Sequence, residues 1–181
     1  MATFPRIPGI VSLTVACVLT SGAASAQPTA AADLQRTTRV RSSDPAIAAL
    51  IAQASHRSPT FRGLVETINT TDGIVYVNEG TCGRGARACF KHQVIIAGPN
   101  RILHILVDPD RPDWDLMGAV GHELRHAIEV LGDATITSDA AMRSFYKQNG
   151  VELNGVLETR AAIAAGADIR SEIREGLRDD R

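Results

Sequence analysis

Residues 121–129 read Gly-His-Glu-Leu-Arg-His-Ala-Ile-Glu and contain the pattern His-Glu-x-x-His. On a helix, residues four positions apart lie on one face, about 40° apart, so the imidazoles of His122 and His126 can bind one zinc ion. Glu123 is offset from His122 by about 100°. It is therefore predicted to lie beside the metal, where it can act as the base for a metal-bound water without being a ligand.

The flanking sequence predicts the helix that this pattern needs. Asp113 is suited to the N-cap position, and Gly132 is suited to the C-terminal stop. Apolar residues recur between them at spacings of three and four: Leu124, Ala127, Ile128 and Leu131.

A catalytic zinc takes three protein ligands and keeps one position open for water. The third ligand has to be an acid beyond the motif, and the candidates are Glu129, Asp133, Asp139, Glu152 and Glu158. Glu129 shares the histidine face but lies about 10.5 Å along the helix axis from His122, so orienting a histidine is its more natural role. Asp133 and Asp139 would need a chain reversal. We favour Glu158, because it lies near the start of a predicted helix of small residues that could pack closely on the motif helix.

His122-Glu123-Leu124-Arg125-His126, followed downstream by Glu158-Thr159-Arg160-Ala161-Ala162, resembles the gluzincin branch of the zincin metallopeptidases. In that branch the third ligand is a Glu on a downstream helix, often four residues before an Ala, and Glu158 and Ala162 match this spacing. The resemblance covers roughly residues 73–175. It looks closest to small bacterial secreted proteins of unassigned activity with a similar His-Glu-Leu-x-His-Ala-x-Glu segment.

The resemblance implies a hydrolase with one zinc per chain that cleaves a peptide or protein substrate by Glu-assisted attack of a zinc-bound water. It also implies that substrate binds along an edge strand before the motif helix, here residues 101–107. Two features depart from the family. The separation of His126 and Glu158 is longer than in compact gluzincins, and no motif marks an oxyanion-stabilising residue. Tyr146 and His104 are candidates; the alternatives are a helix-face aromatic and a strand histidine.

A second interpretation is a zinc-binding protein with the peptidase fold that is catalytically inactive and serves as a binding or scaffold protein. Glu123 favours the enzyme, because a pure binding site does not need a base at that position. The small size of the chain favours the binding protein, because it leaves little material for a deep substrate cleft.

Residues 1–26 are typical of a signal peptide. Arg6 precedes an apolar run at residues 10–19, and Ala24-Ser25-Ala26 fits the cleavage rule. The run is too short to span a bilayer, which disfavours a membrane anchor. Cys82 and Cys89 then remain, and an even count in an exported protein predicts a disulfide, with a second metal site or free thiols as alternatives. We expect a periplasmic or secreted protein.

The chain has 181 residues, with 19 Lys and Arg against 20 Asp and Glu. This balance does not indicate a nucleic acid or, after signal cleavage, a membrane as a partner. The oligomeric state is left open. We expect a flexible leader at residues 27–43, a single zincin-like metallopeptidase domain at 44–176 and a charged tail at 177–181.

The domain is expected to be α+β, with a small three-stranded antiparallel or mixed sheet packed on the motif helix and with further helices. The strands are predicted at residues 73–79, 90–97 and 101–107. The further helices are predicted from Asp44 to before Pro59, around residues 61–68, from Ser138 to Asn149, and at residues 156–175.

Overall fold

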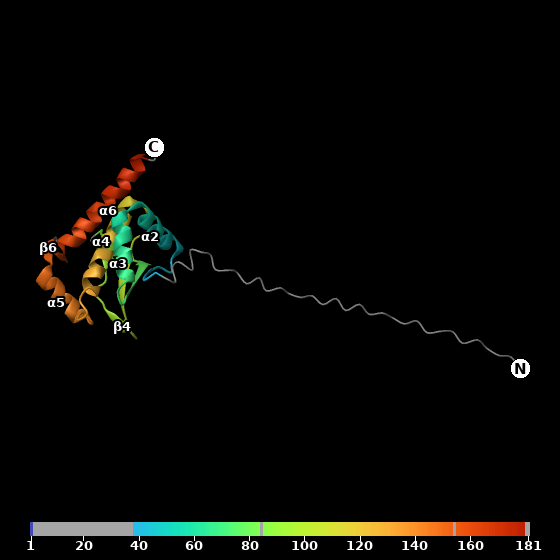
Figure 1. The fold of residues 1–181 in the computed structure, drawn as a ribbon, viewed down its shortest axis with the longest axis horizontal. Coiled ribbons are helices and arrows are strands. Elements are labelled where there is room, and N and C mark those ends of the chain that lie inside the picture. The colour runs from blue at the N-terminus through green and yellow to red at the C-terminus, as the bar shows by residue number, and fades with distance from the viewer. Residues whose placement is uncertain (2–37, 84, 154, 180–181) are drawn as a thin grey trace.

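The computed structural model of the chain describes residue 1 and residues 38–83, 85–153 and 155–179 (Figure 1). These residues form an α+β fold with a mixed sheet and a separate two-stranded antiparallel sheet. The predicted signal peptide, apart from Met1, and residues 27–37 of the predicted leader lie outside the described residues. Val40 and Arg41, which belong to the predicted leader, form strand β1, and Val40 is buried.

Helix α2 (Pro45–Arg57) begins at the predicted cap Asp44, and α3 (Pro59–Asn69), predicted around residues 61–68, begins after the cap Ser58. The Asp44 carboxylate accepts hydrogen bonds from two N–H groups in the first turn of α2. Ser58 ends α2, and its hydroxyl accepts a hydrogen bond from the third residue of α3. Each helix has a proline in its first position, which needs no hydrogen-bond donor.

The mixed sheet has the strand order β1-β2-β5-β3, and β4 also pairs with β5. Strands β1, β2 and β5 run parallel to one another, whereas β3 and β4 run antiparallel to β5. The bounds are β1 (Val40–Arg41), β2 (Gly73–Glu79), β3 (Ala88–Phe90), β4 (Ile95–Ala97) and β5 (Asn100–Val107). Buried side chains alternate along β2 and β5, so one face of the sheet supplies the core.

Three expectations about the sheet were wrong, and the first concerns its size, because the sheet has five strands and not three. The predicted strand at residues 90–97 is divided into β3 and β4, because the backbone turns between them and the N–H of Val94 donates to Asp139 outside the sheet. Strand β5, which was expected at the edge, lies inside the sheet between β2 and β3. Strand β3 is at the edge instead, and it lies against the motif helix.

Helix α4 (Trp114–Leu131) carries the His-Glu-x-x-His pattern and has the predicted caps, Asp113 and Gly132. The Arg101 side chain of β5 ties its C-terminal end to the sheet. Arg101 is 4% exposed. It donates to the carbonyl oxygens of Val130 at 3.0 Å and Leu131 at 2.8 Å, and to two more just beyond the helix. A buried cation therefore satisfies the carbonyls that the end of the helix leaves free.

Helix α5 (Asp139–Asn149) forms as predicted, but the final helix begins later than expected. Residues 151–158 form an antiparallel hairpin of β6 (Val151–Leu153) and β7 (Val156–Glu158). Helix α6 (Arg160–Asp179) follows, with the Thr159 hydroxyl accepting a hydrogen bond from the N–H of Ala162. Glu158 therefore lies on a strand and not on a helix. Residues 177–179 of the predicted tail continue α6.

Helix α6 packs along α4 through small residues, as the sequence predicted (Figure 1). A Cβ atom on Gly118 would lie 3.0 Å from the carbonyl oxygen of Gly166, and a Cβ atom on Gly166 would lie 3.1 Å from the Cβ of His122. Glycine therefore lets the two helices meet almost backbone to backbone, directly beside His122. No helix in the described part of the chain is both long and apolar enough to cross a membrane.

Candidate metal centre

Helix α4 brings His122 and His126 together, as the four-residue spacing predicts. Their ring centroids are 4.9 Å apart, and the rings meet edge to face. The Nε2 atoms of both rings point at one oxygen, Oε2 of Glu158, at 2.8 Å from His122 and 2.9 Å from His126. Two residues on one helix and a third from a separate hairpin therefore converge on a single point.

Strand β7 presents Glu158 to this point. Both imidazoles hydrogen-bond to its carboxylate, and this effect outweighs burial, which by itself raises a carboxyl pKa. The pKa of Glu158 is lowered to about 2. Burial acts to lower the pKa of His126, but its hydrogen bonds with Glu129 and Glu158 outweigh burial and raise that pKa to about 9. The surroundings of His126 therefore strongly favour a positive charge.

Glu129 contacts the other side of the His126 ring. Its Oε2 atom lies 3.0 Å from Nδ1 of His126, and its Oε1 atom accepts a hydrogen bond from the Thr159 hydroxyl at 2.6 Å. A proton on Nδ1 that is donated to Glu129 leaves the lone pair of Nε2 free to bind a metal. Glu129 thus occupies the position of a carboxylate that orients a histidine.

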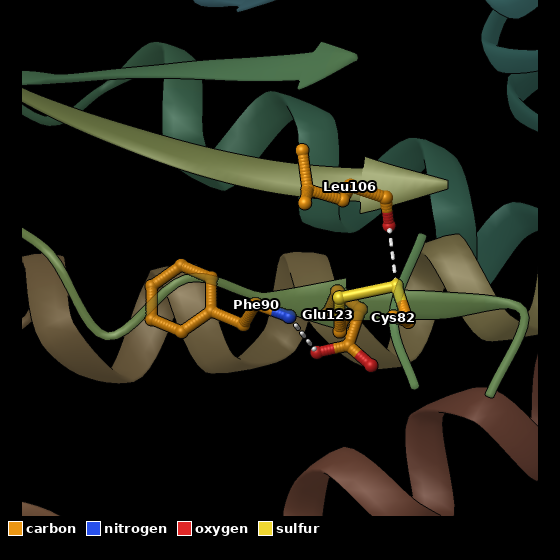
Figure 2. The surroundings of a disulfide bond; sticks show 5 residues. Cys82, Phe90, Leu106 and Glu123 are labelled. Carbon is orange, nitrogen blue, oxygen red and sulfur yellow. Dashed lines mark hydrogen bonds between the residues drawn. A yellow bond between two sulfur atoms is a disulfide. The ribbon is translucent and has the colours of Figure 1, made fainter. Parts of the chain in front are cut away.

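Glu123 lies beside this cluster and is held by the backbone of the edge strand. Its Oε2 atom accepts a hydrogen bond from the N–H of Phe90 at 2.9 Å (Figure 2). Burial raises the pKa of Glu123, and the positive charges of His122 and His126 oppose this rise. The carboxylate is therefore oriented by β3 and partly withdrawn from water.

The donor atoms fit a metal ion. One ligand atom each from His122, Glu123 and His126 all lie within 4.8 Å of one another. Glu123 belongs to this group by distance, but we regard Glu158 as the better third ligand, because its oxygen contacts both Nε2 atoms. Ligand atoms in a tetrahedral zinc site are about 3.3 Å apart, so a shift of a few tenths of an ångström would make room for the ion.

The remaining candidate third ligands lie elsewhere. The Asp133 carboxylate accepts hydrogen bonds from Thr135, and the Asp139 carboxylate accepts one from the N–H of Val94. Glu152 is exposed on β6 and alternates with Val151 and Leu153, so it lies on the opposite hairpin face from Glu158. Among the described residues, none of these three carboxylates contacts His122 or His126.

The two candidate oxyanion residues have different surroundings. Tyr146 is 1% exposed, and its hydroxyl donates to the carbonyl oxygen of His126 at 3.2 Å. Burial raises its pKa. His104 lies on the sheet face opposite the core, where it stacks on Tyr76 and contacts Asn78. Tyr146 is therefore next to the site with its hydroxyl already engaged, whereas His104 is on the far side of the sheet.

Sequence reasoning missed two contributors to the site. The N–H of Phe90 is a backbone group, so its role cannot be predicted from the type of residue. His92 follows it in the turn after β3; its ring stacks on Tyr146 at 5.2 Å and lines the same cavity as Glu123 and His126. A histidine two residues after the end of an edge strand could have indicated that His92 lines the site, but this required β3 to be predicted with its correct bounds.

Cys82 and Cys89 form the predicted disulfide, with their Cα atoms 5.6 Å apart. The bridge lies next to Glu123 and Phe90 (Figure 2). The Cys82 sulfur lies 3.4 Å from the carbonyl oxygen of Leu106, and this is a contact only, because a disulfide sulfur carries no proton. The cysteine loop lines a cavity of about 220 Å³ that it shares with Glu123, His126 and Glu158. The disulfide therefore fixes one wall of the site.

A second cavity, of about 320 Å³, lies on the other side of Glu123 and is lined by His122, Arg87, Asp115 and Arg170, among others. Asp115 accepts a hydrogen bond from Arg170 at 2.7 Å and lies 3.6 Å from Arg87. The space around Glu123 thus has one side lined by Arg87 and Arg170 and, towards the hairpin, a side whose described lining contains no arginine or lysine.

No protein-family model, curated protein or solved structure matches the chain.

Proposed function

We propose that the protein is a zinc-dependent peptidase of the zincin type, with His122, His126 and Glu158 as ligands and Glu123 as the catalytic base. The observation that carries the proposal is the convergence of both Nε2 atoms on one Glu158 oxygen, with the Glu123 carboxylate alongside. A structural zinc site needs four protein ligands, whereas three ligands and a nearby base are typical of a catalytic one.

The chain's own residues supply the remaining parts of hydrolysis. Zinc, when bound, polarises a carbonyl group and acidifies water. Glu123 accepts a proton from the attacking water and is aimed by the N–H of Phe90, so it does not have to be oriented during the reaction. Glu129 holds the ring of His126 in the orientation that presents Nε2.

Strand β3 is the proposed binding edge for an extended substrate. The carbonyl of Arg87 accepts a hydrogen bond from the N–H of Asp108, and the N–H of Lys91 donates to the carbonyl of His104. These two odd-numbered residues therefore direct their backbone groups towards β5. Ala88 and Phe90 therefore direct theirs outward, towards Glu123. With the Phe90 N–H taken by Glu123, the Ala88 N–H and the carbonyls of Ala88 and Phe90 remain to pair with a peptide.

We also propose that the protein acts outside the cytoplasm. The Cys82–Cys89 disulfide supports this, because such bonds persist in oxidising compartments.

The test is hydrolysis of a broad library of quenched peptides by zinc-loaded protein, with Glu123→Gln as the matched variant. Glutamine keeps an oxygen that can accept from the Phe90 N–H but is not a base. We expect cleavage by the wild type, a loss of at least about 100-fold in the variant, and equal zinc content in both. Zinc binding without any cleavage would instead favour the inactive binding protein, and equal cleavage by both proteins would remove Glu123 from the mechanism.

A further inference from the structure

The β6–β7 hairpin has one face that belongs to the metal centre. Its register places Val151 opposite Glu158 and Leu153 opposite Val156. Opposed residues in an antiparallel pair share a face, as do residues two apart, so these four side chains lie together. Since Glu158 contacts His122 and His126, this face is turned towards the site at its Glu158 end.

The other three side chains of that face are apolar and accessible. Val151 is 37% exposed, Leu153 45% and Val156 41%. Exposed apolar side chains are common singly, but three on one short hairpin face beside a candidate active site indicate a binding surface. Val156 also lines the 220 Å³ cavity, together with Glu123 and Phe90. The apolar face is thus continuous with the cavity that contains the proposed base.

The cavity suits one apolar side chain of a longer ligand. Its volume is below the roughly 300–1,000 Å³ of pockets that enclose whole small molecules. Its described lining includes Glu123 and Glu158 but no Lys or Arg, so away from the metal an acidic side chain would meet two carboxylates and no lysine or arginine. The opposite cavity is the one lined by arginine, with Arg87 and Arg170.

We propose that the β6–β7 hairpin selects peptide substrates with an apolar side chain next to the bond that is cleaved, and that Val156 is the principal specificity residue. This inference rests on the proposed peptidase function, since it uses the same centre. A substrate paired along β3 would have the hairpin face on the other side of the cavity. The apolar side chain then leaves water by contacting Val156 and Phe90.

The experiment uses zinc-loaded protein and two peptide series, in which the residue before or after the cleaved bond is Leu, Ser, Glu or Lys. We expect Leu to be preferred over Ser by about tenfold or more in one series, and Glu to be the poorest. Val156→Thr, which keeps the β-branched shape, should reduce the Leu/Ser ratio severalfold. Ile96→Thr is the control, because Ile96 is 53% exposed on β4 and is not in the lining of the cavity.

Peptide binding to Glu123→Gln, measured by fluorescence anisotropy, separates this inference from the proposed function. If the wild type cleaves peptides but shows no Leu preference, or if Val156→Thr and Ile96→Thr have equal ratios, the hairpin inference is overturned and the peptidase stands. If Leu peptides bind with the expected preference and Val156 dependence but are never cleaved, the hairpin surface stands and the peptidase fails. If nothing is bound or cleaved, both fail.

Discussion

His126 is held from both sides, by Glu129 at Nδ1 and by Glu158 at Nε2. The two carboxylates have similar distances to the ring but different chemistry. Only the Glu158 oxygen also contacts the Nε2 atom of His122, so of these two carboxylates Glu158 is the better placed to complete a three-ligand site.

Replacing each carboxylate in turn should separate the two roles. Glu129→Gln should weaken zinc binding by about 10–100-fold, as is usual when a partner of a ligand is lost. Glu158→Gln should weaken it more, because a ligand itself is replaced. Competition with a chelator at one pH measures both, and Glu152→Gln on the opposite hairpin face is the control. A larger loss in Glu129→Gln than in Glu158→Gln would exchange the two assignments.

The hydrogen bond from Phe90 N–H to Glu123 can be removed without interrupting the sheet. Residue 90 directs its N–H away from β5, a position where an edge strand tolerates proline. Phe90→Pro should therefore keep zinc but lower peptide hydrolysis by about tenfold or more relative to Phe90→Leu, which loses the ring and keeps the donor. Equal rates in the two variants would show that the backbone does not position Glu123.

At the scale of elements, Arg101 joins the sheet to the C-terminal end of α4. Its guanidinium is enclosed by the carbonyls of α4 and by Asp72, whose carboxylate lies 2.8 Å from Nη2. Loss of this buried cation would leave several carbonyls without donors. Arg101→Met should cost about 3–5 kcal/mol of unfolding free energy and weaken zinc binding, since α4 carries both histidines.

The same pair gives stability a pH dependence. The hydrogen bond and charge of Arg101 lower the pKa of Asp72 in the folded state. The contribution of Asp72 is therefore complete above its unfolded pKa, near 4, and is lost as the pH falls through the lowered folded pKa. Urea unfolding should find Asp72→Asn less stable than wild type at pH 7, and the difference should shrink as the pH falls below about 4. The exposed Asp110→Asn is the control; a constant difference across this range would contradict the account.

At the scale of the whole molecule, local signals predicted most of the helices but not the neighbours of each strand. Asp44, Asp113 and Ser138 are caps whose hydrogen bonds are made within the next few residues, so α2, α4 and α5 begin where expected. Strand order depends on contacts far apart in sequence. Periodicity showed that β5 is a strand, but it could not show that β3 covers its outer edge.

The types and spacing of the residues predicted the site, but they did not predict the strand that carries Glu158. Alternating residues around Asn154-Gly155 are typical of a hairpin. The alanine-rich run that begins at Ala161 favours a helix, and the predicted helix was extended too far towards the N-terminus, to residue 156. Glu158 still contacts both histidines, because β7 leads directly into α6, which packs along α4. Arg101 gave no local signal, since its partners in α4 lie about 30 residues away.

The central claim is that His122, His126 and Glu158 bind one zinc ion, and metal content tests it most directly. Mature protein purified without chelators, then dialysed against limiting zinc, should contain one zinc per chain by mass spectrometry, and zinc should raise its melting temperature. His126→Ala should contain almost none, whereas His104→Ala, on the far face of the sheet, should match the wild type. Unchanged zinc content in His126→Ala, or a wild type that binds no zinc, would contradict the account.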